Sequence, residues 1–309
     1  MRWRSLLLGC GLALGGCSDS GGNGPTGDGV QDGPCAATAL VGAFETALQD
    51  GFTSVQGRVE SAVTPMRVPE LVAEDGGCRM YRPPTLFCDP ACGSGATCDA
   101  TGACVATPSA VSVGIVTVSG LKAPVQMTPT APVFFYTNTG TLEHPGFEEG
   151  AALTLVAAGD GELDPFTLDA RGVARLSTPA ASVALVQDQS VGLQWTAPGE
   201  PDLSTIHIDL DIAQHGGTPG WIQCEVPDTG SFSIPVALSN QLLAQGASGF
   251  PSLTLTRRSV DSTDTIHGCV QWSAQSSVTL DVEIEGLTSC SDNDDCTAPE
   301  TCQPDLTCG

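Results

Sequence analysis

Cysteine spacing constrains this chain more than any other feature of its sequence. Eight of its fourteen cysteines fall into two clusters, each shorter than 20 residues and each too small to bury a core of its own. Gaps of five residues recur in both clusters and fit poorly with structural zinc, which favours cysteines two to four residues apart. Disulfides are therefore predicted to hold both clusters, which consist of Cys88, Cys92, Cys98 and Cys104, and of Cys290, Cys296, Cys302 and Cys308.

The first seventeen residues have the layout of an export signal. Arg2 and Arg4 precede an apolar run from 5 to 16, which is too short to remain as a membrane span. The tetrapeptide Leu14-Gly15-Gly16-Cys17 resembles a bacterial lipobox. The resemblance implies that a lipoprotein signal peptide, 1–16, is removed and that Cys17 receives acyl chains, and Ser18 then favours the outer membrane. An ordinary secretory signal is the alternative.

Removal of Cys10 and lipidation of Cys17 leave twelve cysteines, an even number that is typical of an exported protein braced by disulfides. Four cysteines allow three pairings. We expect first-to-third and second-to-fourth bonds in each cluster, as in many small cysteine-rich modules. The remaining four cysteines are expected to form two long-range pairs, Cys35 with Cys78 and Cys224 with Cys269.

Short strand-like runs separated by turn residues follow one another along most of the chain. Ile206, Ile208 and Leu210 alternate with polar residues, as expected for strands with one face on a core and one in water. Trp195 shares the phase of its apolar neighbours and is predicted to lie in the core. The pattern predicts a mainly β fold, an antiparallel β-sandwich of immunoglobulin-like type, with two small disulfide-braced cysteine-rich modules and one short helix at 236–245.

Composition shifts divide the chain further. The glycine-rich stretch after Cys17 predicts a flexible tether. The next segment is ambiguous: Ala37, Leu40, Phe44 and Leu48 fit a helical stripe, whereas 52–61 resembles a strand. The predicted units are a tether at 17–34, a small N-terminal disulfide-closed segment at 35–79, a cysteine-rich module at 88–104, a β-rich region at 108–188, an immunoglobulin-like sandwich at 189–287 and a C-terminal cysteine-rich module at 290–308.

Three segments, CDPACGSGATCDATGACV, LQWTAP and WIQCEVPDTGSFSIP, resemble uncharacterised bacterial envelope lipoproteins. Such proteins combine cysteine-rich mini-modules with immunoglobulin-like sandwiches. The resemblance implies a location in the bacterial cell envelope, with a lipid anchor in the outer membrane, and implies no activity.

Charge and motifs exclude several functions. Aspartate and glutamate total 35 against 11 lysines and arginines, a net charge of −24 that argues against nucleic-acid binding. Asp228-Thr229-Gly230-Ser231 matches an aspartic-protease signature, but such enzymes need two paired aspartates, and a turn explains the motif better. The acidic stretches 160–164 and 292–295 could bind calcium or be plain acidic turns. No catalytic residue, cofactor or metal is predicted.

One candidate ligand patch remains. On the strand WIQCEV, Trp221 alternates onto the polar face with Gln223 and Glu225. If this strand neighbours STIHIDLDIA, His207 and Asp209 join them. Exposed aromatics contact sugar rings or protein partners, although Trp221 could instead cover a sheet edge.

We therefore expect a non-enzymatic, lipid-anchored adhesion or ligand-binding module with a glycan or an envelope protein as its partner. The alternatives are a structural subunit of an envelope assembly, or a hydrolase with a dispersed acidic site.

Overall fold

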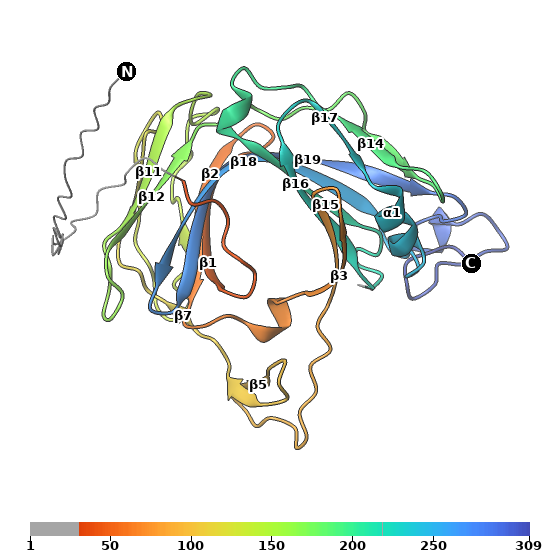
Figure 1. Cartoon of the computed structure of the whole chain (residues 1–309), viewed down its shortest axis with the longest axis horizontal. Coiled ribbons are helices and arrows are strands. Elements are labelled where there is room, and N and C mark those ends of the chain that lie inside the picture. The colour runs from red at the N-terminus through yellow and green to blue at the C-terminus, as the bar shows by residue number, and fades with distance from the viewer. Residues whose placement is uncertain (1–30, 218) are drawn as a thin grey trace, which may run out of the picture.

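The computed structural model describes residues 31–217 and 219–309, so Cys17 and the signal segment lie outside the described residues. The fold is mainly β, as predicted. Its main feature is an eleven-stranded sheet that curves into an arch (Figure 1), with the strand order β10-β2-β1-β19-β18-β15-β16-β4-β3 and with β7 beside β2 and β13 beside β19. Its strands are β1 (Leu40–Leu48), β2 (Thr53–Glu60), β3 (Glu70–Asp75), β4 (Cys78–Arg82), β7 (Ala110–Val111), β10 (Tyr136–Thr137), β13 (Ser182–Leu185), β15 (Thr205–Asp211), β16 (Trp221–Pro227), β18 (Ser252–Thr265) and β19 (Gly268–Ile284).

The long hairpin of β18 and β19 forms the crown of the arch, and the sheet is built outward from it. β1 pairs with β19 in parallel, as does β13, whereas the other pairs of this sheet are antiparallel. The arch therefore joins residues from the N-terminal segment to residues more than two hundred positions later in the chain.

The helical interpretation of Leu40, Phe44 and Leu48 is wrong, because these residues belong to strand β1. A spacing of four residues fits both the helical period and the strand period of two, so Phe44 and Leu48 also share one face of a strand. A bulge between Leu40 and Gly42 breaks the alternation, and Val41 rather than Leu40 joins them in the core. Phe44 packs in a core, and β1 is hydrogen-bonded on both sides, by β19 and β2. The expected strand at 52–61 corresponds to β2.

Two separate cores lie on the outer face of the arch, under two different covers. One core lies between the β2-β1-β19 limb and a four-stranded sheet of order β12-β11-β8-β9. The other lies between the β19-β18-β15-β16-β4 limb, with β13 beside β19, and a cover of the β14-β17 pair and helix α1. The covering elements are β8 (Val116–Ser119), β9 (Val125–Met127), β11 (Ala152–Ala157), β12 (Phe166–Arg171), β14 (Val191–Gln194), β17 (Ser231–Ile234) and α1 (Val236–Leu243), the last at the predicted helix position.

A polar seam separates the two cores at the crown, and its side chains bind the backbone of the covering layers. Ser259 Oγ accepts from Arg171 N at 2.9 Å, and Asp261 Oδ2 accepts from Asp169 N at 2.7 Å. Ser276 Oγ accepts from Leu176 N at 3.1 Å. These bonds satisfy edge backbone groups that would otherwise be buried without partners, which attaches β12 and its neighbours to the arch.

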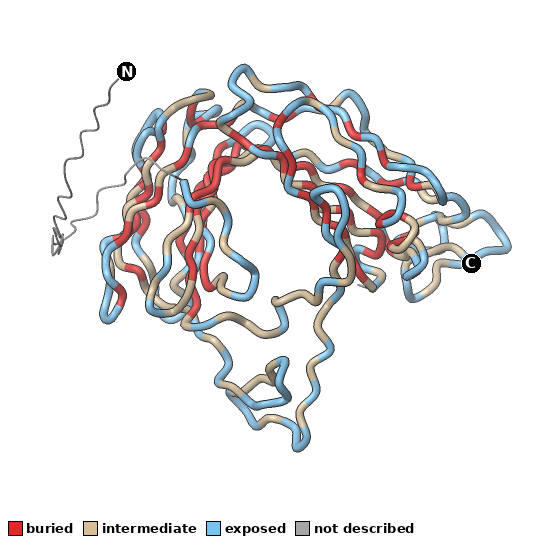
Figure 2. Tube along the Cα trace, viewed as in Figure 1, coloured by how far each residue is buried: buried red, intermediate tan, exposed pale blue. Residues whose placement is uncertain are grey.

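The two cysteine-rich modules sit differently on this frame. The first carries strands β5 (Ala96–Cys98) and β6 (Cys104–Ala106), projects away from the arch and has no buried residue between 83 and 106 (Figure 2). The C-terminal module is docked, since Gly249 N donates to Asp305 O at 2.8 Å and Ser289 Oγ donates to Gly249 O. No helix within 31–217 and 219–309 has the length and apolar character to cross a membrane.

Within each cluster the bonds follow the expected order, first to third and second to fourth: Cys88–Cys98, Cys92–Cys104, Cys290–Cys302 and Cys296–Cys308.

The long-range pairs were predicted wrongly. Cys78 bonds Cys224 and Cys35 bonds Cys269. Cys78 lies directly opposite Cys224 across the β4–β16 ladder, and both are buried in the second core. Cys269 alternates with Val270 and Trp272 of the first core and so points to the other side of the sheet, where Cys224 cannot reach it.

Candidate functional site

The inner face of the arch, opposite both cores, carries the candidate site. A cleft of about 820 Å³ lies there between the segment at 34–37 and strands β4, β15, β16 and β18. Figure 2 shows buried residues along both limbs of the arch and partly exposed ones interspersed with them. The polar side chains that line the cleft are Glu74, Asp75, Arg79, Tyr81, His207, Gln223, Glu225 and Arg258.

The five predicted patch residues come from two strands that are direct neighbours. In the β15–β16 ladder His207 lies opposite Glu225, and Asp209 lies opposite Gln223. Trp221 is one step further along, opposite Asp211. His207, Gln223 and Glu225 line the cleft, while Asp209 and Trp221 are beside it on the same face. Alternation places all five on one side because Ile206, Cys224 and the other intervening residues fill the second core.

Glu225 is the centre of a charged network in the cleft. Its Oε2 atom lies 3.1 Å from His207 Nδ1 and 2.6 Å from Arg258 Nη2, and Thr205 Oγ1 donates to Oε1. Burial raises the pKa of the carboxyl, but the hydrogen bonds and the positive charge of Arg258 outweigh that effect and lower the pKa to about 2. The carboxylate is therefore ionised and already partnered at neutral pH.

Beside this network, Gln223 and Trp221 each have a partner across a strand. Gln223 Nε2 donates to Asp209 Oδ2 at 2.8 Å. Trp221 pairs with Tyr81 across the β16–β4 ladder, with ring centroids 6.1 Å apart and ring planes inclined by 33°. Both rings are half-buried. Trp221 is therefore part of an aromatic pair at the end of the cleft.

Sequence reasoning missed five polar residues of the cleft lining: Glu74, Asp75, Arg79, Tyr81 and Arg258. Arg79 and Tyr81 alternate with the buried Cys78 and Met80 in CRMYR, so the pattern alone could have assigned them to the polar face of a strand. Arg258 likewise follows the buried Arg257. What the pattern lacked was the information that β4 and β18 flank the β15–β16 pair.

Asp228 of the protease-like motif is not a solvent-accessible carboxylate. Its side chain is fully buried and forms an ion pair with Arg257. Trp195 Nε1 and Ser204 Oγ each donate to it at 2.7 Å. Residues 229 and 230 form the predicted turn between β16 and β17. Asp228 thus links the turn to the core through its bonds to Trp195, Ser204 and Arg257.

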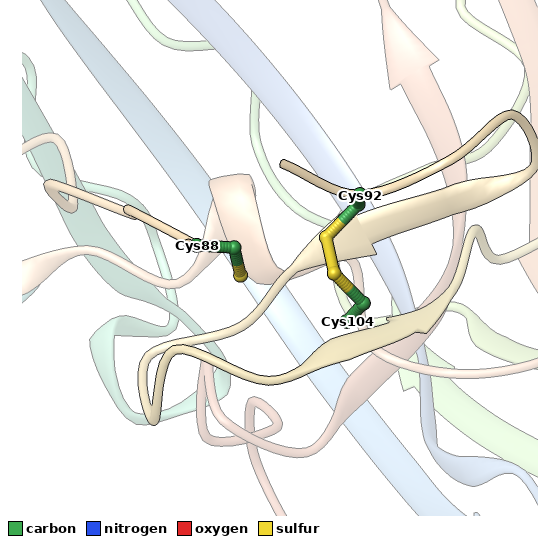
Figure 3. A group of neighbouring side chains, drawn as sticks. All are labelled: Cys88, Cys92 and Cys104. Atoms are coloured by element: carbon green, nitrogen blue, oxygen red, sulfur yellow. A yellow bond between two sulfur atoms is a disulfide. The ribbon is translucent and has the colours of Figure 1, made fainter. Parts of the chain in front are cut away.

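Two groups of cysteine sulfurs lie as close together as metal ligands would. The Sγ atoms of Cys88, Cys92 and Cys104 are all within 4.8 Å of one another, and the C-terminal module repeats the arrangement. Figure 3 shows the disulfide between Cys92 and Cys104, with Cys88 beside it, and Cys88 is bonded to Cys98. A sulfur in a disulfide is not a thiolate ligand, so oxidised clusters cannot hold zinc.

The two acidic stretches use their carboxylates and backbone within the turns themselves. Asp292 accepts from Asp294 N at 2.8 Å, and Asp295 accepts from Ser291 N at 2.7 Å, which caps a short 3-10 helix. Asp160 and Leu163 close the other stretch through a pair of backbone hydrogen bonds.

Comparison with protein-family models finds no match to this chain, and comparison with curated proteins finds none either.

Proposed function

We propose that this chain is a lipid-anchored protein of the bacterial cell envelope whose folded part is a non-enzymatic binding module. The observation that carries the proposal is that His207, Gln223 and Glu225 line one cleft, with Trp221 and Asp209 beside it on the same face. A cleft with an aromatic residue and a few convergent polar groups is the usual form of a small-ligand site.

The anchor and the outer-membrane location are proposed from the lipobox-like Leu14-Gly15-Gly16-Cys17. The immunoglobulin-like relationship is proposed in the same way, from the sandwich arrangement of sheets over two cores. Six disulfides among the described residues agree with folding in an oxidising compartment.

The anchor is tested by Cys17→Ala in a bacterial host. The proposal expects the wild type to incorporate labelled palmitate and to partition into detergent, and the variant to do neither. Equal labelling of both proteins would refute the lipid anchor.

The binding site is tested by chemical protection of Trp221. Trp195 and Trp272 are buried in the cores, whereas Trp221 is half-buried, so a low dose of N-bromosuccinimide should oxidise Trp221 before either of them. Saccharide and protein fractions of bacterial envelopes are then added before oxidation, and the modified tryptophan is located by mass spectrometry. At least one fraction should protect Trp221. If every fraction leaves its oxidation unchanged, the binding module is refuted.

A control variant distinguishes binding in the cleft from non-specific binding to exposed aromatic residues. Phe87 is an aromatic residue that is 76% exposed and lies outside the cleft lining. Phe87→Ala should retain the interaction with the protecting fraction, whereas Trp221→Ala should lose it. Release of reducing ends from the saccharide fraction by the wild type would instead favour a hydrolase.

A further inference from the structure

We infer that the cleft takes an uncharged, chain-like glycan that lies across the strands of the arch, an inference that rests on the proposed function and adds the class of ligand. Three features carry it: an aromatic platform, charges that are mostly paired within the protein, and rows of hydroxyl groups that continue the cleft.

The platform is the Trp221–Tyr81 pair. The two rings are direct cross-strand neighbours, inclined by 33°, and Tyr81 lines the cleft. Their apolar faces are held in place by the ladder, while the ends of the rings carry polar groups. Rings of this kind contribute large contact areas at low entropic cost, which suits a ligand whose sugar rings have one apolar and one hydroxylated side.

Most of the charged side chains in the cleft are paired with one another. Glu225 is bonded to His207 and Arg258, and Arg79 lies 3.6 Å from Glu74. The lining holds three carboxylates and two guanidinium groups, in a chain with 35 acidic and 11 basic residues. A phosphate would have to break these pairs to obtain a counter-charge, and the resulting unpaired groups would cost binding energy. A polycation would find Asp75 as the one carboxylate of the described lining outside these pairs and would have to break the others. A ligand made of hydroxyl and amide groups can bind without breaking these ion pairs.

Hydroxyl groups extend the polar face from the cleft towards the crown. Thr256 lies opposite His207 on one side and opposite Ser277 on the other, and the two hydroxyl oxygens are 2.9 Å apart. One row further along, Thr254 and Thr279 repeat this arrangement at 3.1 Å, beside Asp209.

The direction of these rows fixes the shape of the ligand. From Tyr81 on β4 to Thr279 on β19 the polar path crosses β16, β15 and β18. Strands lie roughly 4.8 Å apart, so a path over five strands is about 19 Å long. A single sugar would cover only the aromatic end, whereas a linear oligosaccharide would reach the hydroxyl rows.

The test uses intrinsic tryptophan fluorescence of the intact, oxidised protein in detergent. Titrations compare neutral hexasaccharides (chitohexaose, cellohexaose and mannohexaose) with chitobiose, with the cationic hexamer of chitosan and with anionic hexagalacturonate. At least one neutral hexamer should bind at least tenfold more tightly than chitobiose and than both charged hexamers. Trp221→Phe should remove the signal, so binding to this variant is followed by calorimetry.

Variants locate the site. Tyr81→Ala and Thr256→Ala should each weaken binding of that hexamer by fivefold or more, and Phe87→Ala should leave it unchanged. Stronger binding of a charged hexamer, equal binding of chitobiose, or no binding of any neutral hexamer overturns this inference. The protection of Trp221 by envelope fractions decides separately whether the cleft binds anything, so the proposed function can survive when the glycan inference fails.

Discussion

Arg257 and Asp228 form an ion pair that is closed off from solvent, with the guanidinium side chain 1% exposed and the carboxylate 0%. Two bonds join them, at 2.5 Å from Nε and 3.1 Å from Nη2. Arg257 also donates to Thr196 O at 2.6 Å, and Trp195 donates to the carboxylate. The pair thus connects β18 of the arch to the turn and the cover above the second core.

Removal of one member of this pair should be costly. Asp228→Ala leaves Arg257 buried without a counter-charge, for which we expect a loss of about 3–5 kcal/mol in the free energy of unfolding. Urea denaturation followed by circular dichroism measures it. Asp202 is exposed and serves as the control, because Asp202→Ala should change the stability by less than about 0.5 kcal/mol. Equal stability of the two variants would contradict the structural role of Asp228.

The two tryptophans near this region should respond differently to truncation. Trp195 is 5% exposed and bonded to Asp228, so Trp195→Ala removes a packed ring and a buried hydrogen bond and should cost about 3–5 kcal/mol. Trp221 lies half-buried on the inner face, and Trp221→Ala should cost less than about 1 kcal/mol. Denaturant melts of both variants provide the comparison. If Trp221→Ala is as destabilising as Trp195→Ala, Trp221 is a core residue and the binding site must be abandoned.

Alternation in the sequence was sufficient to predict most faces of the sheet. It placed Trp195 in a core and put Trp221, Gln223 and Glu225 on the opposite side of β16 from Ile222 and Val226, because the strand period is local. The turn at 229–230 and the helix after Pro235 were also predictable, since turn residues and helix starts are local signals.

Long-range pairing was not predictable, because it depends on contacts that no local pattern contains. β1 is a parallel neighbour of β19, which lies more than two hundred residues away in the sequence. The apolar residues of β1 that recur every four positions fit a helix equally well. The same limit explains the disulfides. Cys35 reaches Cys269 because the N-terminal segment crosses the inner face, where Cys35 N donates to Gln271 Oε1 at 2.9 Å.

The pairing of the long-range cysteines can be checked by peptide mapping. Digestion of the unreduced protein should release one linked peptide pair with Cys35 and Cys269 and another with Cys78 and Cys224. Thiol titration of the denatured, unreduced protein should detect no free thiol among these cysteines. Linked peptides with Cys35 and Cys78 would contradict the fold of the N-terminal segment.

Loss of the Cys35–Cys269 bond should lower the stability of the protein and also loosen the segment that lines the cleft. The double variant Cys35→Ser/Cys269→Ser should lower the free energy of unfolding by about 2–5 kcal/mol, as is typical for a native disulfide. Because residues 34–37 line the cleft, the same variant should also make Trp221 or Tyr81 more reactive. Oxidation rates measured below the unfolding transition test this point. Unchanged rates would mean that the segment stays in place without its disulfide.

Acid should weaken the Glu225 network in a predictable direction. The pKa of Glu225 is lowered from 4.5 to about 2 in the folded protein, so its stabilisation is fully present above pH 4.5 and is lost as the pH falls towards 2. Its side chain is 37% exposed, and solvent screening limits the effect to about 1 kcal/mol. The stability difference between wild type and Glu225→Gln should therefore shrink between about pH 6 and pH 2.5. Glu162→Gln, at an exposed position, is the control for general charge effects. A difference that stays constant over this range would show that His207 and Arg258 do not stabilise the Glu225 carboxylate.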